Sequence, residues 1–520
     1  MKLKHLSRAL AVATIAGGLM LPEMAGAEKL VILHTNDTHS QIDPIETTGL
    51  GGVLRRKAAI DSVRAAEPNV LLVDAGDAVQ GSLFFYLFKG EVEARLMNAM
   101  GVDIGILGNH EFDNGMEALA EMMKMRKDDL LATNYYMEDS ALKGLFKPYT
   151  IRTVGGKRIG FIGVNLNPTG MIAEGNAEGV VYSDAIKSAD LTAEYLKKVL
   201  KADAVVAVTH IGYAPETPPG DDILADQSEY IDVIIGGHTH TVIDSSTQTG
   251  LQRSQATNDD GLPVLIAQTG KSGAYLGKIE IDLDSIGTGS KTYRPKSELI
   301  TIDSRFDKTP DAEMAAIIAE YRPAVDSLLS IPVGTARRNI ERAGVRELNF
   351  MADFIYTRGK EMQPKPVDFA IINRGGLRTD IPKGTISKGQ VINLLPFYNK
   401  ILVLEISGRD LRPVFDAMAR VGGNGVSSQV YAEFDPEDEV ATKVIVNGKP
   451  LDDDKIYRVA TIDYLAKGGD YMYGLKEGKV VGESDKWLYD EMIDWLTTGS
   501  GKNKSFGDGS PKPRMIPVNR

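Results

Sequence analysis

The chain has 520 residues, enough for about two to four domains of ordinary size. Its net charge of −12 argues against a nucleic-acid-binding surface, because such a surface needs a basic stripe. An anionic substrate would be repelled unless a local positive charge, such as a bound divalent cation, attracts it. The chain contains no cysteine, which excludes structural disulfides and a lipoprotein anchor.

Residues 1–27 have the pattern of a secretory signal peptide. Basic residues precede the apolar segment Ala9–Leu21, and Ala25-Gly26-Ala27 matches a cleavage site. The apolar segment is short for a membrane span. We therefore expect cleavage after Ala27, a periplasmic or secreted protein, and no membrane anchor.

Between Glu28 and about Asp303, apolar strand-like runs alternate with helix-like stretches, which predicts a layered α/β domain. The expected helices are Val53–Ala66, Val92–Met100, Glu117–Lys127 and Ile186–Lys201. The composition of residues 218–222, 248–263 and 287–291 predicts loops.

A further helix is expected at Asp311–Ser330, where Pro323 should kink or interrupt it, because proline has no backbone N–H to donate. We place domain boundaries accordingly: 28–304 for the first domain, 305–332 for a helical connector and 333–520 for a second domain. The second domain has its own strands, at 369–377, 399–408, 443–449 and 457–470, and a helix at Arg409–Arg420.

Polar side chains follow five apolar runs of the first domain at the points where the runs end. In chain order they are Asp37 and His39; Asp74 and Asp77; Asn109, His110, Glu111 and Asp113; His210; and His238 and His240. Of the seven histidines, only His5 and His34 lie elsewhere, and we interpret His34, inside the first strand, as structural. Since open α/β sheets bind ligands at one edge, these residues should converge.

The converging set has the composition of a metal centre. In an extended segment, residues two apart point the same way, so Asp37 with His39, and His238 with His240, can each present two ligands. The seven candidates suit two metals that share a carboxylate: Asp37, His39, Asp77, Asn109, His210, His238 and His240. Singly, Asp77 or Asn109 is more often a turn residue, and His210 a core residue.

Four titratable residues of these segments remain outside this set: Asp74, His110, Glu111 and Asp113. His110, steered by Asp113 three residues later, is suited to act as an acid or to stabilise charge on a phosphoryl group. Asp74 could orient a histidine, although a hydrogen bond at the strand end is the simpler role.

The blocks NDTH (36–39), GD (76–77), GNHEFDNG (108–115), TH (209–210) and GGHTH (236–240) resemble the calcineurin-like metallophosphatases. Their order and the second domain narrow the resemblance to the secreted bacterial 5′-nucleotidase and UDP-sugar hydrolase family. It implies a four-layer αββα sandwich followed by an α/β substrate-binding domain.

The resemblance also implies how the residues divide. One metal would be held by Asp37, His39, Asp77 and His240, and the other by Asp77, Asn109, His210 and His238. His110 and Asp113 correspond to the catalytic dyad. The cofactor would be two divalent ions, with zinc or manganese the best match and magnesium, cobalt or calcium as alternatives.

In the second domain, the segment Asn373–Arg378 resembles the family's phosphate and ribose loop. The resemblance implies that Phe397 and Tyr464 sandwich a nucleobase, that Asn373 and Asp470 contact the nucleoside, and that Arg378 binds phosphate. The structural alternative is that the two aromatic residues belong to an ordinary core.

The chain departs from the family pattern at three points. Arg374 stands where the family usually has glycine. Tyr464 stands where phenylalanine is frequent, and its hydroxyl group needs a partner. The upstream phosphate-binding arginine is ambiguous between Arg342 and Arg346, and we assign Arg346.

The predicted function is hydrolysis of nucleoside monophosphates to nucleoside and phosphate, with closure of the two domains around the connector. The alternatives are a 2′,3′-cyclic-nucleotide phosphodiesterase/3′-nucleotidase, a UDP-sugar pyrophosphohydrolase and a thiosulfohydrolase. The non-enzyme alternative is a periplasmic nucleotide-binding protein. The expected partner is a nucleotide and not a nucleic acid.

Overall fold

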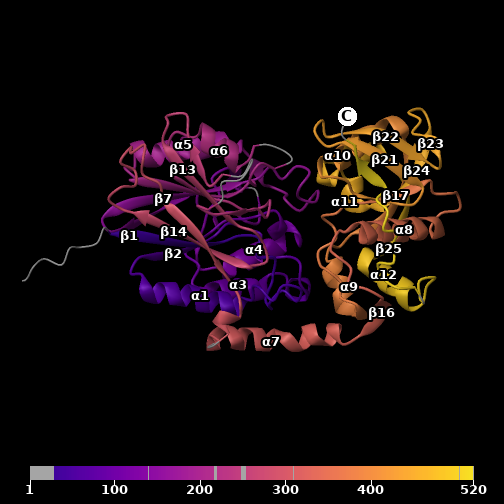
Figure 1. Ribbon diagram of the computed structural model, residues 1–520, viewed down its shortest axis with the longest axis horizontal. Coiled ribbons are helices and arrows are strands. Elements are labelled where there is room, and N and C mark those ends of the chain that lie inside the picture. The colour runs from indigo at the N-terminus through magenta and orange to yellow at the C-terminus, as the bar shows by residue number, and fades with distance from the viewer. Residues whose placement is uncertain are drawn as a thin grey trace, which may run out of the picture.

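The structure is a computed structural model that describes residues 28–518, except 139, 216–218, 247–252, 308–309 and 503. The predicted signal peptide and its cleavage site lie outside the described residues. Two domains lie side by side, and helix α7 (Ala312–Leu329) runs along one side of the molecule beneath both (Figure 1).

The N-terminal domain is built on two β-sheets. Its strands are β1 (Lys29–Thr35), β2 (Val70–Asp74), β3 (Ile104–Gly105), β4 (Asp129–Leu130), β6 (Tyr149–Val154), β7 (Lys157–Asn165), β9 (Ala204–His210), β10 (Val233–Ile235), β11 (Val242–Ile243), β12 (Gln255–Thr257), β13 (Pro263–Thr269), β14 (Tyr275–Asp282) and β15 (Lys296–Thr301), with a separate pair β5 (Tyr135–Tyr136) and β8 (Val181–Tyr182). One sheet has the order β15-β14-β1-β2-β3-β4, and the other β11-β13-β10-β9-β7-β6 with β12 beside β13.

Alternation along the strands explains why the two sheets stack. In β1, Leu30 and Ile32 enter a core shared by both sheets, whereas Val31 and Leu33 face the opposite way, toward helices. The helices are α1 (Val53–Ala66), α2 (Leu83–Phe88), α3 (Glu91–Met100), α4 (Gly115–Met125), α5 (Ala185–Lys198) and α6 (Asp221–Gln227). Figure 1 shows α5 and α6 above the sheets and α1 and α3 below them, which confirms the four-layer αββα arrangement.

The expected helices of this domain are present within a few residues of their predicted bounds. Two expected loops contain regular structure. Helix α6 begins at Asp221, where two acidic residues in its first turn favour helix formation. Strand β12 lies inside 248–263 because it pairs with β13.

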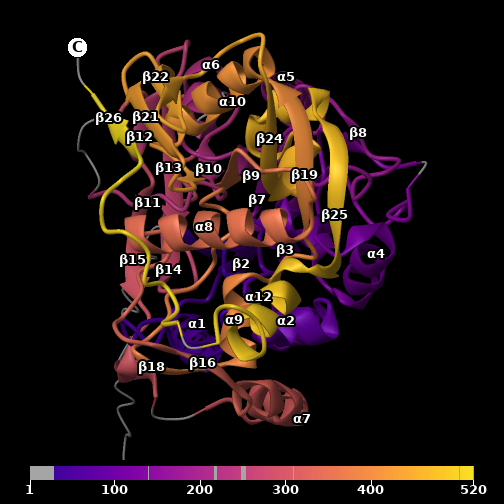
Figure 2. The ribbon, with the colours of Figure 1, turned by 90° about the vertical axis from the view of Figure 1, so that its right-hand side faces the viewer.

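The C-terminal domain contains a five-stranded sheet of order β20-β17-β24-β19-β25 and a second sheet of order β23-β22-β21-β26. Its elements are β16 (Pro332–Ala336), α8 (Val345–Glu361), β17 (Phe369–Ile372), β18 (Gly384–Ser387), α9 (Lys388–Leu394), β19 (Lys400–Ser407), α10 (Gly408–Arg420), β20 (Gly425–Val426), β21 (Val430–Asp435), β22 (Val440–Val446), β23 (Lys449–Pro450), β24 (Ile456–Ile462), α11 (Asp463–Ala466), β25 (Lys479–Trp487), α12 (Leu488–Thr497) and β26 (Met515–Pro517). Figure 2 looks onto this domain, where α8 crosses the view and β19 stands between β24 and β25.

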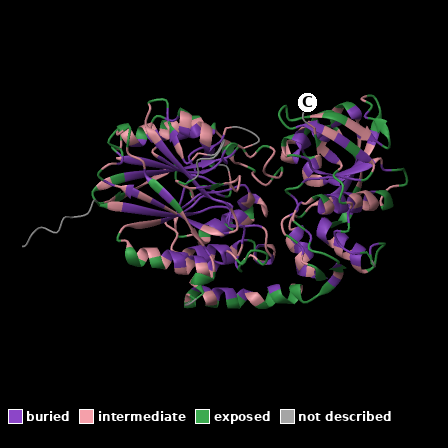
Figure 3. Cartoon of the chain, viewed as in Figure 1, coloured by how far each residue is buried: buried purple, intermediate pink, exposed green. Residues whose placement is uncertain are grey.

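Helix α7 continues through Pro323, so Pro323 does not interrupt it. Its buried residues lie on both sides of the proline, at Met314, Ile317, Ile318, Tyr321 and Val325. This buried face contacts α2 and α3 of one domain and α9 of the other, and that packing holds the helix together across the missing hydrogen bond. Figure 3 shows the buried residues concentrated in the sheets, with exposed positions along α7.

Candidate active site

Most of the predicted metal ligands lie just beyond the strand ends, and the four in the first and last segments lie in tight left-handed turns, whereas His210 is the last residue of β9. Asp37 and His39 both have φ 48°, and His238 and His240 have φ 75° and 56°. The expected extended conformation is therefore wrong: left-handed turns, not strands, direct each pair inward. Such a backbone costs about 1–3 kcal/mol per non-glycine residue and is typical of functional sites.

Together with the ends of β2, β3 and β9, these turns bring side chains from five strand ends into one cluster. The Nε2 atoms of His39 and His240 are 3.0 Å apart, and His240 Nε2 lies 3.3 Å from Asp37 Oδ1. His210 Nε2 lies 3.2 Å from Asp77 Oδ2. The cluster also includes His238 and Asn109, whose Nδ1 and Oδ1 atoms are 3.0 Å apart.

Backbone carbonyls set the orientation of two of the imidazole rings. His210 Nδ1 lies 2.7 Å from the Ala75 carbonyl, and His39 Nδ1 lies 3.3 Å from the Val79 carbonyl. A proton on each Nδ1 satisfies these contacts and leaves Nε2 as a free electron pair aimed into the cluster. This is the arrangement that holds histidine ligands in metal sites.

The donors of this cluster fit divalent cations. The Asp37 Oδ1 and His210 Nε2 atoms are buried and have no hydrogen-bond partner among the described residues. A buried acceptor without a partner is costly, and a cation would satisfy both atoms. Acidic and imidazole donors within 4.8 Å of one another form three overlapping groups: Asp37, His39 and His240; His39, Asp77 and His110; and Asp37, Asp77 and His210.

Glu111 anchors the turn that carries Asp77. Its carboxyl accepts backbone hydrogen bonds from Gly108 at 2.6 Å, Asp77 at 3.1 Å and Ala78 at 2.8 Å. Burial and the neighbouring Asp77 carboxylate raise the pKa of Glu111 to about 7. A side chain on Gly108 would collide with Asp77 Oδ1, so glycine is required there. The sequence places Glu111 in the block GNHEFDNG, but it does not predict that Glu111 anchors the turn of Asp77.

The predicted dyad is assembled beside the cluster. His110 Nδ1 lies 2.8 Å from Asp113 Oδ2, and the His110 backbone N–H donates to Asp77 Oδ1 at 2.9 Å. Burial of the ring opposes protonation, but the carboxylates of Asp113 and Asp77 outweigh it and raise the pKa of His110. A protonated imidazole at this position can donate a proton or stabilise negative charge.

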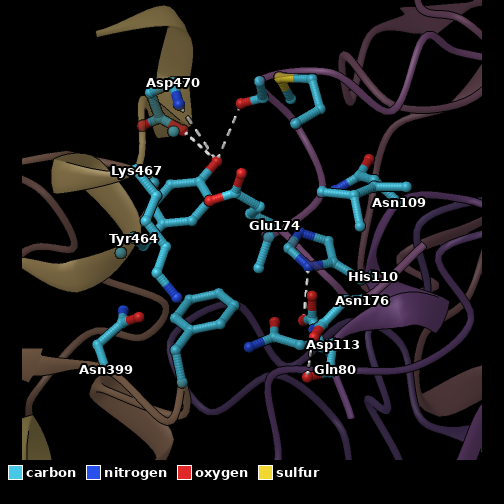
Figure 4. Close-up of a pocket in the computed structure, with 18 of the residues that line it drawn as sticks. Gln80, Asn109, His110, Asp113, Glu174, Asn176, Asn399, Tyr464, Lys467 and Asp470 are labelled. Carbon is cyan, nitrogen blue, oxygen red and sulfur yellow. Dashed lines mark hydrogen bonds and ion pairs between the residues drawn. The ribbon is translucent and has the colours of Figure 1, made fainter. Parts of the chain in front are cut away.

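A cavity of about 860 Å³ lies between the two domains, and the dyad opens into it. From the N-terminal domain it is lined by Asp77, Asn109, His110, Asp113, His238 and His240, and from the C-terminal domain by Asn373, Arg378, Phe397, Tyr464 and Asp470. Figure 4 shows Asn109 and His110 on one side of this cavity and Tyr464 and Asp470 on the other.

Comparison with known proteins agrees with this arrangement. Residues 30–242 match the calcineurin-like phosphoesterase family, and residues 327–477 match the 5′-nucleotidase C-terminal domain. The chain belongs to the 5′-nucleotidase family. The human 5′-nucleotidase is 28% identical over 91% of this chain and 88% of its own length. Protein UshA of Yersinia enterocolitica is 28% identical over 85% of this chain and 86% of its own length.

A solved structure of a family member has the same fold. The 5′-nucleotidase precursor from Thermus thermophilus superposes with a TM-score of 0.82 at 29% identity and covers 95% of this chain and 100% of its own. This family member is therefore a metallophosphoesterase of two mixed α/β domains. Among the residues that its structure describes, no helix is both long enough and apolar enough to cross a membrane.

In this 5′-nucleotidase family member, the hydroxyl group of Tyr464 has the partner that the sequence required. It donates to Asp470 Oδ1 at 2.9 Å, and Asn373 Nδ2 donates to the other Asp470 oxygen at 2.7 Å. Asp470 has φ 50°, again a left-handed backbone at a predicted site residue. These contacts hold three predicted nucleoside-binding residues as one unit.

The structure does not bring Arg346 to the cavity. Its Nη1 atom donates to the Gly509 carbonyl at 3.0 Å, near the C-terminus. Arg342 lines the cavity instead. The two arginines precede and follow the start of α8, and the sequence alone does not tell which one faces the site.

A positive cluster borders the metal ligands. Arg378 lies 3.5 Å from the His39 ring, and Lys271, which the sequence did not single out, follows β13 in the loop beside Asp37. Burial, then the charges of Arg342 and Arg378, lower the pKa of Lys271 to about 8. Within the described part of the chain, none of these three cations forms an ion pair with a carboxylate. Cations gathered in this way suit a phosphate group.

Two remaining predictions concern buried residues outside the cluster. His34 is fully buried, and burial lowers its pKa to about 3, consistent with a structural neutral histidine. Asp74 accepts hydrogen bonds from the Thr35 hydroxyl at 2.6 Å and the Gly76 N–H at 3.2 Å, which is the strand-end role.

Proposed function

We propose that this protein hydrolyses nucleoside 5′-monophosphates to nucleoside and phosphate. One observation carries the proposal: the histidine and aspartate cluster of one domain faces the aromatic rings and arginines of the other across a single cavity. A nucleotide has matching parts, with a phosphate at one end and a flat base at the other.

In this proposal two divalent ions occupy the cluster. Asp37, His39, Asp77 and His240 would hold one, and Asp77, Asn109, His210 and His238 the other. When bound, the ions supply Lewis-acid charge to the phosphoryl group and acidify the attacking water. Zinc and manganese both fit imidazole and carboxylate donors.

His110 has the acid or electrostatic role. Its Nδ1 atom is taken by Asp113, so Nε2 is the atom available to the substrate. From there it protonates the leaving 5′-oxygen or stabilises the charge of the transferring group. Asp113 fixes the ring orientation and supports the positive charge.

The C-terminal domain supplies substrate binding. Arg378 and Arg342 contact phosphate oxygens, for which the guanidinium fork is suited. Phe397 and Tyr464 stack on the base, and the pair Asn373 and Asp470 contacts the ribose. The Arg378 guanidinium lies 5.9 Å from the centre of the Phe397 ring, so the phosphate and base sites adjoin.

The test is phosphate release by the metal-loaded protein from AMP, UDP-glucose, 2′,3′-cyclic AMP and bis-p-nitrophenyl phosphate, with and without a chelator. We expect AMP to be preferred and the chelator to abolish turnover. Preference for the cyclic or diester substrate would instead identify a phosphodiesterase. Preference for UDP-glucose would identify a pyrophosphohydrolase. No turnover with two metals bound would favour a binding protein.

Replacing Phe397 by leucine tests the base site. The change keeps apolar volume beside His110, whose ring centre is 5.9 Å away, but removes the stacking face. Because stacking contributes about 1–3 kcal/mol per base, KM for AMP should rise about 5- to 150-fold. For p-nitrophenyl phosphate the change should be much smaller. Tyr431→Leu, on β21 away from the cavity, is the matched control, and equal losses on both substrates would contradict the base site.

Export belongs to the same proposal, because residues 1–27 carry the basic, apolar and small-residue pattern of a signal peptide. The protein recovered from the periplasm or medium should begin at Glu28. N-terminal sequencing checks this, and an intact N-terminus on the exported protein would contradict it.

A further inference from the structure

One loop of the N-terminal domain touches both halves of the site. Residues 168–178, here called the bridging loop, lie between β7 and β8 and line the cavity along their whole length. Their sequence contains none of the motifs described above. Turns brace the loop, with hydrogen bonds from Ile172 N to Pro168 O at 2.9 Å and from Asn176 N to Ala173 O at 3.0 Å.

The beginning of the bridging loop is held by the nucleoside-binding residues. The Gly170 carbonyl accepts a hydrogen bond from the Asp470 backbone N–H at 3.0 Å. It also lies 3.3 Å from the Tyr464 hydroxyl oxygen, whose single proton is shared between this carbonyl and the nearer Asp470 Oδ1. Gly170 has φ 86°, and a side chain there would lie 2.9 Å from the Tyr473 hydroxyl oxygen. Glycine adopts this φ without strain, and its lack of a side chain leaves room for this close contact between the domains.

The end of the bridging loop is attached to the dyad. The Asn176 side-chain amide donates to the carbonyls of Phe112 at 3.0 Å and Asp113 at 3.2 Å. Figure 4 shows Asn176 beside Asp113 on the His110 side of the cavity. Ile172 also packs against the core cluster that contains the fully buried Phe112. The loop therefore fixes the backbone from which Asp113 holds His110.

We propose that Asn176 is a positioning residue for the His110–Asp113 dyad. In this proposal, the bridging loop links nucleoside binding in the C-terminal domain to the alignment of the dyad. The inference rests on the proposed function, since it assumes that Tyr464 and Asp470 meet the nucleoside. A bound nucleoside would hold this pair against Gly170, and the braced loop would then hold Asn176 against the dyad. Substrate binding and dyad alignment become one event.

The test compares Asn176→Ala, Tyr464→Phe and the double variant with the wild type, all in the full-length metal-loaded protein. Asn176→Ala should lower kcat for AMP about 10- to 100-fold, because small displacements of catalytic groups are costly, while KM changes less than about two-fold. Metal content should stay at the wild-type level. Asn176→Gln, which keeps the amide, should recover part of the rate.

Tyr464→Phe keeps the ring and removes only the hydroxyl, so it should lower kcat for AMP through the same route. The double variant should then lose little more than Asn176→Ala alone. Asn98→Ala is the matched control: Asn98 also donates to a backbone carbonyl, that of Met125 at 2.8 Å, but lies outside the cavity lining. It should lower stability without changing kcat.

Unchanged kcat in Asn176→Ala, or fully additive losses in the double variant, would overturn the inference. If the wild type hydrolyses no nucleotide, the proposed function fails separately. Asn176→Ala must even then lower kcat on an alkyl phosphate such as glycerol phosphate, because both possible roles of the dyad, protonation of the leaving oxygen and charge stabilisation, serve that ester. If Asn176→Ala does not fold, Asn176→Gln and Tyr464→Phe still give the comparison.

Discussion

Replacing His110 by alanine is expected to lower kcat for AMP by about 10²- to 10⁴-fold, the range for loss of a general acid. Metal content should stay at the wild-type level, because the ring is held by Asp113 and not by the ligand turns. Steady-state kinetics and metal analysis of the same preparation measure both. Loss of metal together with activity would instead make His110 a ligand, which its place in one donor group with His39 and Asp77 allows geometrically.

A second substrate separates the two roles of His110. If it protonates the leaving oxygen, the loss on p-nitrophenyl phosphate should be far smaller than on AMP, because p-nitrophenolate leaves without a proton. If it stabilises charge on the transferring group, the two losses should be similar. Asp113→Asn is the companion variant. It removes the carboxylate that raises the pKa of His110, so it should give a smaller loss of the same kind.

The sequence predicted those parts of the site whose residues lie close together along the chain. A buried strand, a turn and a ligand follow one another within about ten positions, so apolar runs that end in histidine or aspartate could be recognised without knowing the pairing of the strands. The four-layer arrangement followed from the resemblance, and the alternating burial in β1 supports it.

What the sequence did not show depends on contacts between distant residues or on local backbone geometry. Gly170 meets Asp470, 300 positions later, and nothing in the loop composition points to that contact. Arg342 and Arg346 lie four positions apart, and only the packing of α8 decides which faces the cavity. The ligand turns differ from the extended conformation expected for them, because sequence periodicity does not register a single left-handed residue. Proline ordinarily breaks a helix, but the packing of α7 keeps the helix continuous through Pro323.

Asp77→Asn is expected to have the other large effect, because this carboxylate is the proposed shared ligand of both metals. One oxygen accepts the His110 N–H at 2.9 Å and the other lies 3.2 Å from His210 Nε2. Asparagine keeps the shape and tolerates the φ of 52°, so the turn should survive. Activity should fall to background, and metal content should fall below two ions per chain.

Thermal unfolding shows whether this loss arises at the metal centre. Added zinc or manganese stabilises a protein that binds it in the folded state, by about 2.7 kcal/mol at a concentration 100 times Kd. The wild type should therefore gain Tm on metal addition, and Asp77→Asn should gain much less. Without metal the variant should also be somewhat less stable than the wild type. Burial opposes the charge of Asp77, but the imidazoles of His210 and His110 outweigh it and hold the pKa of Asp77 well below its usual range, and asparagine loses this interaction. An equal rise in Tm for both proteins on metal addition would show that Asp77 is not a shared ligand.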